Sequence, residues 1–290
     1  MRLPQAALIA FVLLAAPAQA ATREYWVAAA PTNWNPVPNG VDALHGTRFE
    51  NTLFPTVTYR AYTRGWKAPA TSERIPGPLL RARVGDRLRI HFKNLDRDAP
   101  HSMHFHGVTY KPSSDGSYLP GFSGPGAEVR PGRAFTYELT AGENSAGVWS
   151  YHDHGPAMEE AIAGGMYGVL SILGRGEREP DREFVTFFTA LKGFETINGR
   201  AFVGNTPVFK ARVGDVVQWD VLTLGDEVHT FHVHGHRWRR NGAPEDTRPV
   251  APAESWKVRW TERSPGTWLY HCHFESHMMQ GMVGLYRVSR

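Results

Sequence analysis

The chain has one cysteine, Cys272, among its 290 residues, so it cannot form an internal disulfide. After residue 20 the sequence has no apolar run long enough to cross a bilayer as a helix, and we expect no membrane-spanning segment in the mature chain. Its 32 basic and 28 acidic residues leave a net charge of only +4. That charge is too small and too dispersed to indicate nucleic-acid binding.

The first twenty residues are typical of a secretory signal. Arg2 precedes an apolar run at residues 6–16, and an Ala-Gln-Ala cleavage site occupies residues 18–20. We therefore predict a signal peptide at 1–20 and an exported protein, either periplasmic or secreted. An exposed free thiol would be prone to oxidation in such a compartment, whereas metal ligation would protect it.

Long uninterrupted helical patterns are scarce, because glycine and proline break the chain often. Short runs that alternate or are rich in β-branched and aromatic residues predict strands, for example at 87–93, 216–221 and 256–260. This pattern predicts an all-β chain built from two β-sandwiches. The polar stretch 175–182 is a candidate linker between them.

The segment 271–282 carries the most specific chemistry. Neighbouring side chains on a strand point to opposite faces, so His271 and His273 face one way and Cys272 the other. A thiolate with two imidazoles and the weak thioether of Met282 matches a mononuclear blue-copper centre. His277 supplies one of these imidazoles, and the other two histidines must serve a different metal.

The segment 229–235 completes this division. His232 and His234 share one strand face, and His229 lies at an odd offset on the other. By the same reasoning His229 joins Cys272, His277 and Met282. His232 and His234 then join His271 and His273.

The first half of the chain repeats these motifs in the same order. His104-Phe105-His106-Gly107 matches 232–235, and His152-Asp153-His154 matches 271–273. Residues 82–86 match 211–215, and 147–152 match 266–271, so duplication of one domain is the simplest interpretation.

The mononuclear set is absent from the first copy. Asp153 replaces the cysteine there, and Met158 stands where His277 stands in the second copy. His101 matches His229, so it could be a remnant of the lost mononuclear site. It could equally well be an ordinary exposed histidine, and we assign it no metal role.

Four His-x-His motifs in this order resemble the multicopper oxidases, and with two repeats the chain is similar to the two-domain small laccases. The resemblance implies two cupredoxin-like Greek-key domains, at 21–177 without a type 1 copper and at 178–290 with one. It implies four coppers per functional unit: one type 1, one type 2 and two type 3. The implied ligands are His104, His106, His152, His154, His229, His232, His234, His271, Cys272, His273, His277 and Met282.

Within the cluster, the resemblance assigns His104 and His232 to the type 2 copper and the other six histidines to the type 3 pair. It also brings Tyr110 and Asp115 close to the cluster, with Asp115 as a candidate proton donor. Tyr110 could equally well serve only in packing, and Asp115 could simply belong to a turn at 113–116.

The implied reaction is oxidation of phenols or aromatic amines coupled to reduction of dioxygen to water, as in laccases. A cuprous or ferrous metallo-oxidase is the main alternative. A copper nitrite reductase or a copper carrier would not need the eight extra histidines. The resemblance to small laccases implies a ring of subunits in which the first domain of one subunit meets the second domain of the next. We therefore predict a homotrimer with clusters at subunit interfaces.

Overall fold

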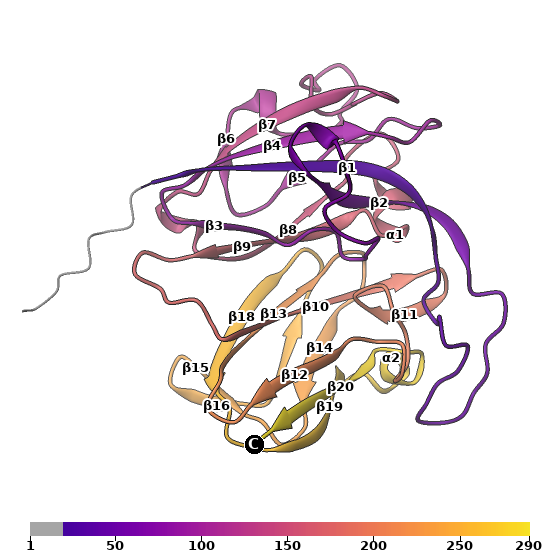
Figure 1. Ribbon diagram of the computed structural model, residues 1–290, viewed down its shortest axis with the longest axis vertical. Coiled ribbons are helices and arrows are strands. Elements are labelled where there is room, and N and C mark those ends of the chain that lie inside the picture. Colours follow the sequence, from indigo (N-terminus) through magenta and orange to yellow (C-terminus); the bar gives the residue numbers. More distant parts are fainter. Residues whose placement is uncertain (1–19) are drawn as a thin grey trace, which may run out of the picture.

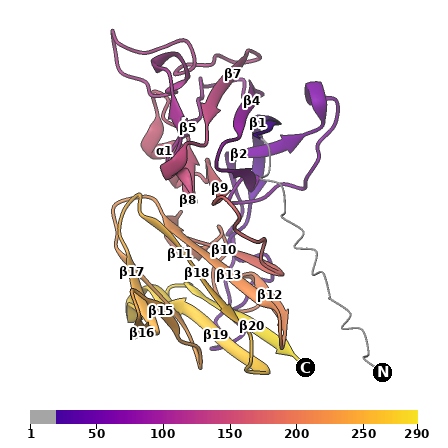
Figure 2. The ribbon, with the colours of Figure 1, turned by 90° about the vertical axis from the view of Figure 1, so that its left-hand side faces the viewer.

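The computed structural model describes residues 20–290, so the predicted signal peptide lies almost wholly outside the described residues. The described part consists mainly of strands in two stacked sandwiches, the first above the second in Figure 2. Residues 174–181 connect them, and the exact domain boundary stays a prediction. None of the helices between residues 20 and 290 is long and apolar enough to cross a membrane.

The first sandwich has two sheets. One has the strand order β2 (Phe54–Tyr62), β1 (Thr22–Trp34), β4 (Arg87–Asn94), β7 (Ala134–Thr140) and β6 (Thr109–Tyr110). The other has the order β3 (Leu80–Arg83), β9 (Tyr167–Leu173), β8 (Gly147–His152) and β5 (His104–Phe105). Four short helices decorate the loops: η1 (Arg64–Trp66), η2 (Pro112–Ser114), η3 (Glu143–Ser145) and α1 (Met158–Ala163).

The second sandwich has the same plan. One sheet has the order β11 (Phe194–Ile197), β10 (Arg182–Leu191), β13 (Val216–Thr223) and β18 (Ser255–Thr261). The other has the order β12 (Val208–Arg212), β20 (Val283–Ser289), β19 (Gly266–Cys272), β14 (His229–Val233) and β17 (Thr247–Val250). A hairpin of β15 (Trp238–Arg240) and β16 (Ala243–Glu245) and the helix α2 (Glu275–Met279) complete it.

The strand pairing confirms the duplication. β1 runs parallel to β4 as β10 runs parallel to β13, and β3 pairs with β9 as β12 pairs with β20. The register agrees as well, because His104 faces His152 across β5 and β8, and His232 faces His271 across β14 and β19. The three strands expected at 87–93, 216–221 and 256–260 are β4, β13 and β18.

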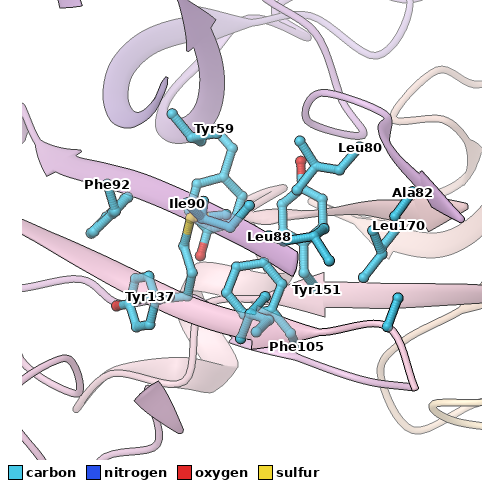
Figure 3. Close-up of a cluster of buried hydrophobic side chains, with 14 of the residues drawn as sticks. Tyr59, Leu80, Ala82, Leu88, Ile90, Phe92, Phe105, Tyr137, Tyr151 and Leu170 are labelled. Atoms are coloured by element: carbon cyan, nitrogen blue, oxygen red, sulfur yellow. Dashed lines mark hydrogen bonds between the residues drawn. The ribbon is translucent and has the colours of Figure 1, made fainter. Parts of the chain in front are cut away.

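The core of the first sandwich holds the histidine-bearing strand in place (Figure 3). Tyr59, Tyr137 and Tyr151 are fully buried, and each hydroxyl donates a hydrogen bond to a backbone carbonyl at 2.6 Å. A buried hydroxyl without a partner would cost stability, so these bonds fix how the rings pack. Tyr59 bonds to Ser102, which places the chain just before His104.

A long connection from the first sandwich lies along the second. Residues 35–53, between β1 and β2, descend beside β11 and α2 in Figure 1. There Phe49 stacks on Phe202 with ring centroids 4.5 Å apart and meets Phe194 edge-on at 5.8 Å. The guanidinium of Arg200 lies 3.8 Å from the ring of Trp34, the last residue of β1. The first repeat thus supports the loop 198–206 of the second.

A buried carboxylate, Asp220, lies between the sandwiches. Gln218 donates to its Oδ1 at 2.7 Å, but its Oδ2 has no partner. Burial, followed by repulsion from Glu183, raises the pKa of Asp220 well above its usual value. Glu183 itself accepts hydrogen bonds from Ser171 and Arg81.

We expect Asp220→Asn to stabilise the protein increasingly as pH rises. A raised folded-state pKa means that stability is lost as pH climbs above the unfolded-state pKa of the carboxyl group, and a neutral amide avoids that loss. Thermal melts should be similar near pH 4, and at pH 8 the variant should melt about 2–4 °C higher for each ~1 kcal/mol regained. A constant difference between variant and wild type from pH 4 to 8 would contradict this assignment.

Candidate metal centres

Three predicted ligands of the mononuclear site meet inside the second sandwich. β14 begins at His229, β19 ends at Cys272, and α2 carries His277. The Cys272 Sγ lies 3.9 Å from His229 Nδ1 and 3.7 Å from His277 Nδ1, and the two nitrogens are 3.1 Å apart. The fourth predicted ligand, Met282, is fully buried, and its carbonyl accepts a hydrogen bond from the Cys272 amide at 3.1 Å.

The donor triangle fits one metal ion. A point equidistant from the three atoms lies about 2.1 Å from each, within the roughly 2.0–2.3 Å of metal bonds to imidazole and thiolate. Burial lowers the pKa of His229 to about 4, so its imidazole is neutral and available at physiological pH. Burial raises the pKa of the Cys272 thiol, so a thiolate there needs a cation beside it. Two imidazoles, a thiolate and a buried thioether suit copper.

Gly281 allows two other segments of the chain to pack closely beside the mononuclear site. Gly281 has φ 129°, and a Cβ there would lie 2.5 Å from the Cβ of Ala201 and 2.6 Å from the carbonyl oxygen of Glu195. Only a residue without a side chain allows β11 and the loop 198–206 to pack against the residue before Met282.

The first histidine set lies at the ends of β5 and β8. Donor nitrogens of His104, His106 and His152 all lie within 4.8 Å of one another, and His106 Nε2 is 3.2 Å from His152 Nε2. Burial lowers the pKa of both His106 and His152 to about 4. His154 is adjacent, with its ring centroid 5.2 Å from that of His104.

The second histidine set repeats this arrangement on β14 and β19. His232, His234 and His271 offer nitrogens within 4.8 Å of one another, and His234 Nε2 lies 3.1 Å from His271 Nε2. The ring of His273 is centred 5.3 Å from that of His232. His234 and His273 are exposed, so this set faces outward.

Backbone carbonyls fix the tautomers of four histidines. His104 Nδ1 donates to Asp115 at 2.8 Å, and His232 Nδ1 donates to Asp246 at 2.7 Å. Likewise His152 bonds to the carbonyl of Asp153, and His271 to that of Cys272. A carbonyl can only accept, so Nδ1 carries the proton and each Nε2 keeps a lone pair for a metal. The matched bonds show that both repeats present the same kind of donor.

The two histidine sets do not come together within one chain. Between residues 20 and 290, no close ring contact joins a histidine of one set to a histidine of the other. The donor groups that could hold one ion are likewise separate. The chain therefore has two separate groups of four histidines.

Tyr110 and Asp115 both lie beside the first set. The ring of Tyr110 is centred 6.1 Å from that of His104, and Asp115 Oδ1 lies 3.5 Å from His104 Nδ1. Burial and then the neighbouring carboxylate raise the pKa of Tyr110 to about 12. Their proximity to the set matches the expectation, and their roles stay predictions.

Two glutamates near the mononuclear site were not identified from the sequence. Oxygens of Glu195 and Glu227 lie within 4.8 Å of nitrogens of His229 and His277, and Glu227 is 3.5 Å from His277 Nε2. Burial, with Glu227 as the second cause, raises the pKa of Glu195 to about 7. Glu195 is only 8% exposed. It lies on β11, far from the motif in sequence, so no local spacing points to it.

Two histidines without a predicted metal role are also buried. His101, for which an exposed position was one interpretation, is only 6% exposed, because Asp153 and Asp96 bond to its two nitrogens. His236 donates from Nδ1 to the carbonyl of His234 and contacts Glu262 through Nε2 at 3.1 Å. It therefore links the backbone of His234, a member of the second set, to the buried Glu262.

Comparison with known proteins gives a consistent family. Two sequence profiles described as multicopper oxidase match residues 57–177 and 177–290. A probable nitrite reductase-hydroxylamine oxidoreductase fusion protein of Kuenenia stuttgartiensis is 32% identical over 240 residues, 74% of this chain and 27% of that protein. Ferroxidase HEPHL1 of Mus musculus is 29% identical over 359 residues, 97% of this chain and 30% of that protein. The chain thus spans less than a third of these relatives.

Solved structures share the fold. A crystal structure described as a multicopper oxidase matches with a TM-score of 0.74 and 26% identity, over 92% of this chain and 89% of that one. A copper nitrite reductase from Nitrosomonas europaea matches with a TM-score of 0.71 and 19% identity, over 93% and 94% of the two chains. The expected pair of cupredoxin-like sandwiches is confirmed.

Proposed function

Because the chain belongs to the multicopper oxidase family, we propose that it couples single-electron oxidations to the four-electron reduction of dioxygen to water. The observation that carries the proposal is the coexistence of a mononuclear His₂Cys site with two matched histidine sets. Copper, when bound, supplies reversible one-electron chemistry and reactivity toward dioxygen. The twelve predicted ligands would hold four coppers per functional unit.

The protein's contribution is to connect and shape these sites. Cys272 belongs to the mononuclear site, while His271 and His273 on either side of it belong to the second histidine set. Three consecutive residues therefore form a short covalent route between the two. Asp115, whose carboxylate lies 3.5 Å from His104 Nδ1, would deliver protons to the reduced oxygen atoms.

We propose that the cluster is completed between chains. Each chain presents two separate sets of four histidines, whereas a trinuclear cluster needs both sets around one space. A head-to-tail ring in which the first set of one subunit meets the second set of the next satisfies this, and a homotrimer is the predicted form. Export to the periplasm or outside the cell, signalled by residues 1–20, is part of the same proposal.

For the reductant, a phenol or aromatic amine near His277 is the first candidate. The ring of Phe274 lies 5.3 Å from that of His277 and is 43% exposed, so an aromatic substrate could pack against it.

A ferrous or cuprous ion is the second candidate, and the two glutamates favour it. Glu195 Oε2 is buried without a partner, and Glu227 lies on the solvent side next to His277. Carboxylates can bind a reducing metal ion and place it against the imidazole through which an electron enters. The ferroxidase similarity over 97% of the chain supports this candidate as well.

Oxygen uptake by copper-loaded protein tests the proposal. We expect uptake driven by a phenol, by Fe(II) or by Cu(I), and no nitrite consumption in the absence of oxygen. Nitrite reduction without oxygen uptake would instead establish the nitrite-reductase alternative. The similarity of this chain to the Kuenenia fusion protein is the comparison that bears on that alternative. Copper binding without either reaction would indicate a carrier.

We expect Glu227→Gln to separate the two reductant classes. Loss of the carboxylate beside His277 should lower kcat/KM for Fe(II) roughly tenfold and leave phenol oxidation nearly unchanged, because only the metal ion needs the charge. The matched control is Asp226→Asn, which removes the same charge from the neighbouring exposed residue. Equal losses with Fe(II) in both variants would show a general charge effect and contradict the proposed ion site.

A further inference from the structure

The first repeat retains the framework of the mononuclear site, but Asp153 replaces its cysteine and Met158 stands in place of its second histidine. Asp153 occupies the position of Cys272, and its amide donates to the carbonyl of Met166 at 3.0 Å, as the Cys272 amide donates to that of Met282 at 3.1 Å. His101 occupies the position of His229. The backbone arrangement of the site is therefore preserved and the histidine is retained, but a carboxylate replaces the thiolate.

Both carboxylate oxygens of Asp153 have hydrogen-bond partners. Its Oδ2 lies 2.6 Å from His101 Nδ1, and its Oδ1 accepts from the amide of Ser102 at 2.8 Å and that of Gly155 at 2.9 Å. The Ser102 hydroxyl, 3.1 Å from the same oxygen, accepts a hydrogen bond from the His154 amide at 3.0 Å. These contacts tie the segment that carries His152 and His154 to His101 and Ser102.

Asp96 completes the arrangement from the other side of the imidazole. Its Oδ2 lies 3.0 Å from His101 Nε2, so both ring nitrogens face carboxylates and donate to them. Asp153 is 1% exposed, His101 6% and Asp96 7%, so little solvent competes with these bonds. His101 has no nitrogen left for a metal, which excludes a second mononuclear centre here.

We propose that Asp96, His101 and Asp153 form a metal-free clasp that positions the first histidine set. In the second repeat, ligation of one ion by Cys272 and His229 would join β19 to β14. In the first repeat, the Asp153 carboxylate and the His101 imidazole join the corresponding segments without an ion. The clasp holds His152 and His154 in place before copper arrives, so Asp153 is a positioning residue. This inference rests on the proposed copper-binding role of the first set.

Asp153→Asn tests the clasp, since it keeps the shape of the side chain but removes the charge opposite His101. In the metal-free full-length protein, we expect the amides of residues 152–155 to exchange hydrogen at least about tenfold faster than in wild type. In the copper-loaded protein, copper affinity at the histidine cluster should fall roughly 10–100-fold, the usual effect of losing a residue that orients a metal ligand. The visible absorption of the Cys272 site should be unchanged.

The matched control is Asp42→Asn. Asp42 is also buried and lies 2.6 Å from a histidine, His45, but in the connection 35–53 and not beside either histidine set. We expect it to leave both the exchange of residues 152–155 and the cluster's copper affinity unchanged. If Asp153→Asn does not fold, Asp96→Asn removes only the outer carboxylate and should give a smaller change in the same direction.

If Asp153→Asn folds and the hydrogen-exchange rates of the amides of residues 152–155 are unchanged, the clasp is overturned. If only Asp96→Asn folds, unchanged exchange rates in that variant overturn it in the same way. This readout needs no copper, so it is independent of the proposed function. A wild-type protein that binds copper only at the Cys272 site would refute the proposed function instead, whatever the exchange rates show.

Discussion

Cys272→Ser is expected to abolish the intense visible absorption of the copper-loaded protein and to lower oxygen uptake roughly a thousandfold, equivalent to about 4 kcal/mol in the activation barrier. The Cys272 thiolate is the only sulfur anion available to the mononuclear site, and it lies between two residues of the second histidine set. Its loss removes both the ligand and the covalent route for electrons.

The Cys272→Ser substitution should remove only the type 1 copper. Neither histidine set includes Cys272, so we expect three of the four coppers and the electron paramagnetic signal of the type 2 copper to persist. Met279→Leu is the control, because Met279 is 52% exposed on the same helix as His277. Oxygen uptake that survives Cys272→Ser would show that electrons enter the histidine cluster by another route.

Mixing two inactive variants is expected to restore activity. One variant replaces His104 and His106 by alanine, and the other replaces His232 and His234, so each lacks one histidine set. If clusters form between chains, reassembly of mixed subunits should create intact interfaces at about one contact in four, with a matching share of wild-type oxygen uptake. Each variant alone should be inactive, because every interface then lacks one set.

The control keeps both variants in the mixture but prevents exchange of subunits, for example by crosslinking each assembly beforehand. Activity should then stay absent. If the mixture remains inactive although mass measurements show mixed assemblies, the cluster must form within one chain. That result would contradict the separation of the two sets observed here.

The histidine sets could be predicted from the sequence because the rules involved are local. Side-chain alternation on a strand separates Cys272 from His271, and the repeated His-x-His pairs identify the corresponding segment of the first copy. The register of β14 against β19 then follows from placing His232 beside His271. The all-β architecture followed from equally local strand patterns.

The neighbours of the metal sites could not be predicted in the same way, since their contacts follow no regular sequence spacing. Glu195 reaches the mononuclear site only because Gly281 lets β11 approach closely. Asp96 reaches His101 through a bend in the loop after β4. An isolated acidic residue in a sequence carries no spacing signal that would reveal either contact.

The most direct test of the central claim is the electron balance of oxygen consumption, measured on copper-loaded protein together with its copper content. We predict about four coppers per functional unit, four reducing equivalents consumed per dioxygen, and no accumulated peroxide. One copper per chain, or two equivalents per dioxygen with stoichiometric peroxide, would contradict the assignment of a cluster built from both histidine sets.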